Sequence, residues 1–131
     1  MMSVIDHLEI AVTDAELSRQ FYQQALAPLG FRLVITVDPA HNRTGGFRHG
    51  LGPEGYPRLW LHDCASTVAP VHVAFSARER ATVDQFWAAA IRAGGKDNGA
   101  PGIRRHYHDH YYAAYILDPD GNNLEVVCQQ R

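Results

Sequence analysis

Several classes of protein are excluded by what this sequence has little of. Only two cysteines, Cys64 and Cys128, occur in 131 residues, which is too few for a disulfide framework or a thiolate metal site. No apolar run approaches the roughly 18 residues of a membrane-spanning helix, and the first ten residues lack the regions of a secretory signal. The formal net charge is -2, without the basic face that nucleic acid or an anionic membrane attracts. We therefore expect a cytoplasmic protein whose partner is a small molecule.

The composition that remains is that of one globular domain. Hydrophobic residues make up 46% of the chain and charged residues 20%, and 131 residues are enough for one core. Within this length the sequence repeats itself at an offset of 65 residues, because His7 pairs with His72 and Gly30 with Gly95. We therefore expect a single domain over residues 1–131, built from two modules at about 4–63 and 70–129.

Each module is predicted to run from strand to helix to three strands. Apolar residues alternate in HLEIAV and HVAFSA, which predicts the opening strands. Asp14 is a candidate N-cap, and Leu17, Phe21 and Ala25 are expected on the buried face of the first helix. The remaining strands are expected in FRLVITV, in the Gly/Pro-rich stretch after it, and in RLWLH, YYAAYIL and NLEVVC. KDNGAPGIRRHYHDH is expected to be mostly loop with a short strand.

Three side chains that can bind a metal lie on the face of their strands opposite the apolar residues. His7 and His72 lie opposite the apolar face of equivalent strands, and Glu125 alternates with apolar residues in the last strand. Two imidazoles and one carboxylate with open positions form the arrangement that non-heme Fe(II) favours, and Zn, Mn, Ni or Co also accept it. The alternative is that both histidines are hydrogen-bonded structural residues and Glu125 is merely exposed.

These segments resemble the vicinal oxygen chelate superfamily, which includes glyoxalase I, bleomycin-resistance proteins and extradiol dioxygenases. The resemblance rests on IDHLEIAV with SRQFYQQALAPLGF, on VHVAF with QFWAAAIRAGG, and on DPDGNNLEV, and it covers nearly the whole chain. It implies an α+β fold of two tandem βαβββ modules, with a cup-shaped mixed sheet and helices on its outer face. It also implies a divalent metal on His7, His72 and Glu125, and members of this size are often homodimers.

The two catalytic branches of the superfamily differ in their number of ligands. The glyoxalase branch adds a fourth ligand late in the first module, and the repeat places that position at Trp60, which cannot coordinate a metal. His62 lies on the same face two residues further on, about 6–7 Å along the strand. The extradiol dioxygenase branch uses three ligands, and this count favours it.

A second stretch, RHYHDHYYAAYILDPDGNNLE, resembles the extradiol signature of a histidine, a tyrosine and a turn before the ligand glutamate. The resemblance implies that Tyr115 hydrogen-bonds substrate beside the metal and that His106 or His108 contacts it and moves protons. One departure is Ala114, where the signature prefers a large apolar residue. The alternative for this cluster is a polar loop that its histidines hold by hydrogen bonds.

Two functions remain open at this point, together with a third possibility, a degenerate member of the superfamily without a small-molecule role. The first is a metal-dependent enzyme whose substrate chelates the metal through adjacent oxygens, in extradiol-like ring cleavage or a glyoxalase-like lyase or isomerase reaction. The second is a metal-free drug- or antibiotic-binding protein, in which Trp60, Tyr111 and Tyr115 stack on a planar ligand. Trp60, Tyr111 and His62 are the candidate substrate-binding residues under the first hypothesis.

Overall fold

The fold is two βαβββ modules side by side. The structure is a computed structural model that describes residues 4–41, 45–64 and 69–130. Module 1 comprises β1 (Leu8–Val12), α1 (Ala15–Ala25), β2 (Arg32–Val37), β3 (Arg48–Gly52) and β4 (Leu59–Asp63), with short 3-10 helices at Ala27–Leu29 and Pro39–His41. Module 2 comprises β5 (His72–Ser76), α2 (Arg80–Arg92), β6 (Lys96–Ile103), β7 (Tyr112–Leu117) and β8 (Asn123–Cys128).

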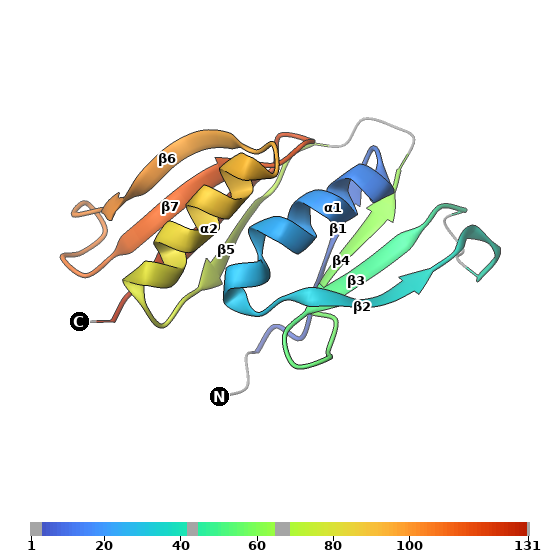
Figure 1. The fold of residues 1–131 in the computed structure, drawn as a ribbon, viewed down its shortest axis with the longest axis horizontal. Helices are drawn as coiled ribbons and strands as arrows, with labels where there is room; N and C mark the ends of the chain where they lie inside the picture. The colour runs from blue at the N-terminus through green and yellow to red at the C-terminus, as the bar shows by residue number, and fades with distance from the viewer. Residues whose placement is uncertain (1–3, 42–44, 65–68, 131) are drawn as a thin grey trace.

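Each module forms its own four-stranded mixed sheet. Sheet A has the order β1-β4-β3-β2 and sheet B the order β5-β8-β7-β6. The β1/β4 and β5/β8 pairs are parallel, whereas the other neighbours are antiparallel. The two helices lie next to each other over one side of the sheets, and β1 and β5 are the inner edge strands (Figure 1). The opposite side of each sheet, which we call its open face, lies away from the helices.

The first helix begins where the sequence predicts, and it ends at Ala25, before a short 3-10 turn. The Asp14 side chain accepts a hydrogen bond from the Leu17 amide at 3.0 Å, and Gly30 ends the following 3-10 turn with a φ of 82°. The prediction that Leu17 is buried is wrong, because 52% of it is exposed. Ser18 takes its place on the buried face.

The segment after α2 contains the main difference from the prediction. Residues expected to be mostly loop form β6, a strand of eight residues. Its pairing with β7 shifts register on both sides of Gly99, which has a φ of 150°. The glycines and the proline that suggested a loop occupy an irregular edge strand, where bulges tolerate them.

One core joins the two modules. Phe21 and Tyr22 of α1 and Phe86 of α2 are fully buried in a single apolar cluster, and the burial of Phe21 agrees with its helical spacing. The Tyr22 hydroxyl donates to Asp118, a buried carboxylate in the turn between β7 and β8. Asp118 also accepts hydrogen bonds within its own turn, from the Asn122 amide at 2.7 Å for example. The turn of module 2 is thus fastened to the helix of module 1.

Neither helix of the described residues is long and apolar enough to cross a membrane.

Candidate functional site

The open face of sheet B brings two of the three predicted metal ligands together. His72 is the first residue of β5, and Glu125 lies in the neighbouring parallel strand β8, diagonally across from it. The His72 Nε2 atom is 3.0 Å from Glu125 Oε1. The Glu125 side chain is only 4% exposed, whereas that of His72 is 49% exposed. The pair therefore joins a buried carboxylate to an imidazole that solvent can reach.

The backbone fixes which nitrogen of His72 faces Glu125. His72 Nδ1 lies 2.9 Å from the carbonyl oxygen of Asn123, which can only accept a hydrogen bond, so Nδ1 carries the proton. Nε2 of a neutral ring then presents a lone pair to a carboxylate oxygen. Such a contact needs a proton or a cation between the two atoms.

The His72–Glu125 pair fits a divalent metal. Imidazole nitrogen and carboxylate oxygen are ligands that iron, zinc and manganese accept. Two ligands with bonds of about 2.1 Å at a right angle stand about 3.0 Å apart, which matches the observed distance between Nε2 and Oε1. A histidine ligand also commonly donates its other N–H to a carbonyl, as His72 does.

Two tyrosines flank this pair. The Tyr111 hydroxyl donates to Glu125 Oε2, and the Tyr115 ring lies 6.3 Å from the His72 ring, nearly parallel to it. Burial, with the Glu125 charge beside it, raises the pKa of Tyr115 to about 12. Burial and the hydrogen bond to Glu125 raise the pKa of Tyr111 still further. Both phenols therefore keep their protons at neutral pH and act as donors.

His7, the third predicted ligand, lies apart from the pair. It precedes β1 on module 1, and its Nδ1 atom is 2.7 Å from Asp6 Oδ1. The hydrogen bonds from His7 and from the Tyr56 hydroxyl lower the pKa of Asp6. No three His, Cys, Asp or Glu side chains are grouped to hold a metal in the ranges that the structure describes. The structure thus unites His72 with Glu125 but does not bring His7 to them.

Trp60 and His62 belong to a polar cluster on the open face of sheet A. The Arg48 guanidinium lies 4.5 Å from the centre of the Trp60 ring and pairs with Glu9. His62 Nδ1 is 3.0 Å from Glu9 Oε2. That nitrogen is buried and lacks a hydrogen-bond partner in the described part of the chain, because the contact has the distance of a hydrogen bond but not its direction.

Sequence reasoning missed two members of this cluster. Strand alternation places Glu9 on the same face as His7, so the signal for it was present. Arg48 gave no such signal, because it lies in a Gly-rich stretch whose strand boundaries the sequence did not define.

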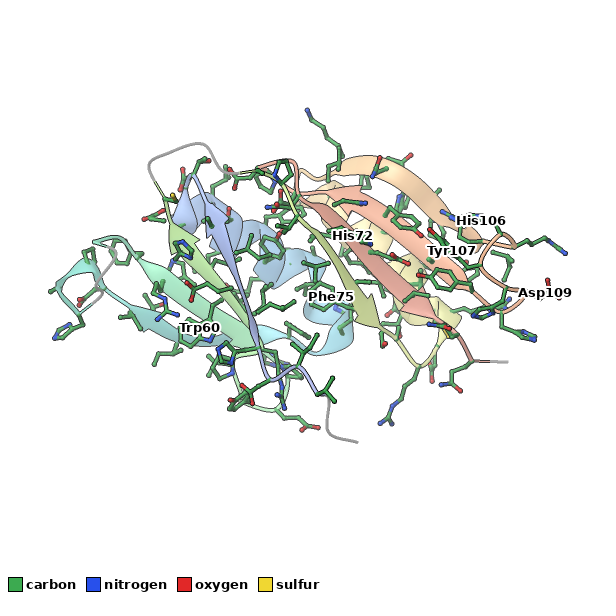
Figure 2. All side chains as sticks on the ribbon, turned by 180° about the vertical axis from the view of Figure 1, so that it is seen from behind. Trp60, His72, Phe75, His106, Tyr107 and Asp109 are labelled. Atoms are coloured by element: carbon green, nitrogen blue, oxygen red, sulfur yellow. The ribbon has the colours of Figure 1, made fainter. Side chains whose placement is uncertain are left out.

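The histidine-rich loop before β7 is held by its own hydrogen bonds. His108 Nδ1 accepts from the His110 amide at 3.0 Å, and its Nε2 is 2.8 Å from Gln129 Oε1. The His106 ring lies 4.2 Å from the Tyr107 ring, and both residues are exposed at the outer end of sheet B (Figure 2). Both nitrogens of His108 are therefore engaged within the loop and its neighbouring strand end.

A separate groove lies between the modules. Its volume is about 720 Å³, and its apolar lining includes Leu29, Phe31 and Phe75. The Phe31 and Phe75 rings meet edge to face with their centres 5.5 Å apart. The groove is large enough for a small organic ligand.

Known proteins share this architecture. A profile of the Glyoxalase/Bleomycin resistance protein/Dioxygenase superfamily matches residues 4–126. A glyoxalase/bleomycin resistance protein from Albidiferax ferrireducens T118 is 26% identical, with a TM-score of 0.73 and coverage of 98% of this chain and 100% of that one. A glyoxalase I mutant from Zea mays is 25% identical, with a TM-score of 0.71 and coverage of 94% of this chain and 45% of that one. No curated protein sequence matches the chain.

Proposed function

Because the chain belongs to the Glyoxalase/Bleomycin resistance protein/Dioxygenase superfamily, we propose that it is a divalent-metal-dependent enzyme of the vicinal oxygen chelate type. Its substrate is a small molecule that binds the metal through two adjacent oxygens. The observation that carries this proposal is the His72–Glu125 pair, in which an oriented imidazole nitrogen meets a buried carboxylate at 3.0 Å. When bound, the metal supplies Lewis acidity and a template for the substrate oxygens.

His72, Glu125 and His7 are the proposed ligands, and Fe(II) is the first candidate metal, ahead of Zn, Ni, Mn and Co. His7 is oriented as a histidine ligand commonly is, since its Nδ1 faces the Asp6 carboxylate and we propose its Nε2 as the metal-binding atom. His7 lies on module 1, so we propose a homodimer in which sheet A of one chain faces sheet B of the other. Such a dimer would bring His7 to the pair.

Tyr115 is the proposed substrate-facing donor. Its raised pKa keeps the hydroxyl protonated, so it can donate a hydrogen bond to negative charge that develops on a substrate oxygen. His106 is the proposed proton carrier of the loop, since both nitrogens of His108 are engaged. Trp60 and His62 are proposed to line the substrate side of module 1. Ring cleavage of a catechol-like diol fits three ligands, and a glyoxalase-like lyase reaction is the other candidate.

A metal-free binding protein is the second candidate, and two observations favour it. The contact between His72 and Glu125 is a complete hydrogen bond if the imidazole is doubly protonated. The groove at Phe31 and Phe75 also offers an apolar surface for a planar ligand.

Metal analysis of tag-free protein separates these candidates. The enzyme hypothesis predicts stoichiometric metal that is lost in His72→Ala. Absence of metal, with unchanged thermal stability after addition of Fe(II), Mn(II), Ni(II) and Zn(II), would contradict it. Oxygen consumption with Fe(II) and catechols, compared with glyoxalase turnover with Ni(II) or Zn(II), then distinguishes the two reactions.

A further inference from the structure

Tyr111 holds one oxygen of the buried carboxylate. It directly precedes β7, and its hydroxyl donates to Glu125 Oε2, whereas Glu125 Oε1 faces His72 Nε2. The two oxygens of Glu125 therefore have different neighbours. The terminal torsion of a glutamate side chain is otherwise broad, so a donor on one oxygen fixes the direction of the other.

The histidine-rich loop holds Tyr111 in turn. The Arg104 amide donates to the Tyr111 carbonyl at 2.7 Å, and the Tyr111 amide donates to the His108 carbonyl at 3.2 Å. The Tyr111 ring lies 4.6 Å from the Tyr107 ring and meets the His108 ring edge to face at 5.6 Å. Because Gln129 follows β8, its contact with His108 ties the loop to the strand that carries Glu125.

We infer that Tyr111 is a positioning residue, whose hydroxyl orients Glu125 toward a divalent metal shared with His72, and that the 104–111 loop serves to hold it. This inference rests on the proposed function. In this inference Tyr111 orients the Glu125 carboxylate and does not bind the substrate, although substrate binding is the role expected for it from the sequence. It also explains why an exposed loop carries a set of aromatic and imidazole rings packed on one tyrosine.

Tyr115 also lies beside Glu125, directly opposite it in the β7–β8 pairing, but unlike Tyr111 it faces His72 as well. It lies four residues further along, and its ring stacks on His72, the ligand at the exposed side of the pair. Tyr111 instead donates to Glu125 Oε2, the carboxylate oxygen that does not face His72. Removal of the Tyr111 hydroxyl therefore affects the ligand geometry of Glu125, whereas the substrate side is left intact.

Calorimetric titration of tag-free protein with Zn(II) tests the inference. Loss of an outer-shell partner typically weakens metal binding by about 10–100-fold, and we expect this for Tyr111→Phe. Tyr107→Phe is the matched control, because it removes a hydroxyl from the adjacent ring without touching Glu125, and its affinity should equal that of the wild type. The Co(II)-loaded Tyr111→Phe protein should also show a shifted d–d absorption spectrum, which a remote packing change would not produce.

Wild-type affinity and an unchanged Co(II) spectrum in Tyr111→Phe would overturn the inference, while loss of metal in His72→Ala would still support the proposed function. If the wild type binds no Zn(II), Co(II) or Fe(II), both are wrong. If Tyr111→Phe does not fold, Gln129→Ala replaces it, because that variant loosens the loop and keeps the tyrosine. Weaker Zn(II) binding by Gln129→Ala then supports the inference, and wild-type binding overturns it.

Discussion

The hydrogen bond between Tyr22 and Asp118 gives a direct test of how the modules are held together. Tyr22 lies on α1 of module 1, Asp118 lies in the β7–β8 turn of module 2, and both are buried. Tyr22→Phe removes the hydroxyl and keeps the ring in the core. Burial and the Asp118 charge raise the pKa of Tyr22, so the hydroxyl is a donor throughout the neutral range.

The loss of stability in Tyr22→Phe depends on the hydrogen bonds that Asp118 keeps in the variant. A hydrogen bond to a charged group contributes about 1.5–3 kcal/mol, and Asp118 still accepts from the amides of Asp120 and Asn122 and from the Asn122 side chain. We therefore expect a loss near the lower end, about 1.5–2 kcal/mol in the free energy of unfolding.

Urea unfolding measures this loss as a lower midpoint at constant slope. Tyr112→Phe is the matched control, because its hydroxyl donates to Asp84 in an exposed hydrogen bond. We expect that variant to change stability by less than about 0.5 kcal/mol. Equal stability of Tyr22→Phe and Tyr112→Phe would refute the view that this bond fastens the modules.

Three further predictions concern the site and the first helix. Tyr115→Phe should lower turnover at least about tenfold, because the hydroxyl acts on substrate charge; an unchanged kcat would remove Tyr115 from the mechanism. The hydrogen bond from Arg19 lowers the pKa of Glu16 to about 2, so its contribution to stability is present above about pH 4.5 and is lost as the pH falls toward 2. The melting temperature of Glu16→Gln should therefore depend less on pH between about 4.5 and 2 than that of the wild type. The same pH dependence in both proteins would contradict this. In urea unfolding, Leu17→Glu should change the free energy of unfolding by less than about 0.5 kcal/mol, because Leu17 is exposed. Phe21→Ala should lower it by about 3–5 kcal/mol, because Phe21 is buried in the core. A loss of that size in Leu17→Glu would contradict the observed burial.

Strand alternation made the centre of the candidate site predictable. Side chains of a strand alternate strictly between faces, so the apolar residues beside Glu125 fix its direction, and the repeat relates His72 to the same strand of the other module. The relative orientation of the two sheets has no such local signal. For that reason the sequence predicted three ligands in one group, whereas the structure brings together only His72 and Glu125.

Other features depend on long-range packing that a single sequence does not encode locally. The Arg48–Glu9 pair and the Tyr22–Asp118 bond join residues 39 and 96 positions apart. The β6 strand was missed because its Gly99 and Pro101 are typical of loops, although an edge strand with bulges accommodates both. Ser18 is buried in place of Leu17, and its hydroxyl donates to Asp120 of the β7–β8 turn at 3.5 Å, a contact between residues 102 positions apart.

The central claim is that His72 and Glu125 hold a divalent metal. The most direct measurement is the Zn(II) and Fe(II) affinity of tag-free wild type, His72→Ala and Glu125→Gln, with His41→Ala, an exposed histidine on module 1, as the control. The account predicts binding by the wild type and His41→Ala, and its loss in His72→Ala and Glu125→Gln. Equal metal binding by all four proteins, or none by the wild type, would contradict it.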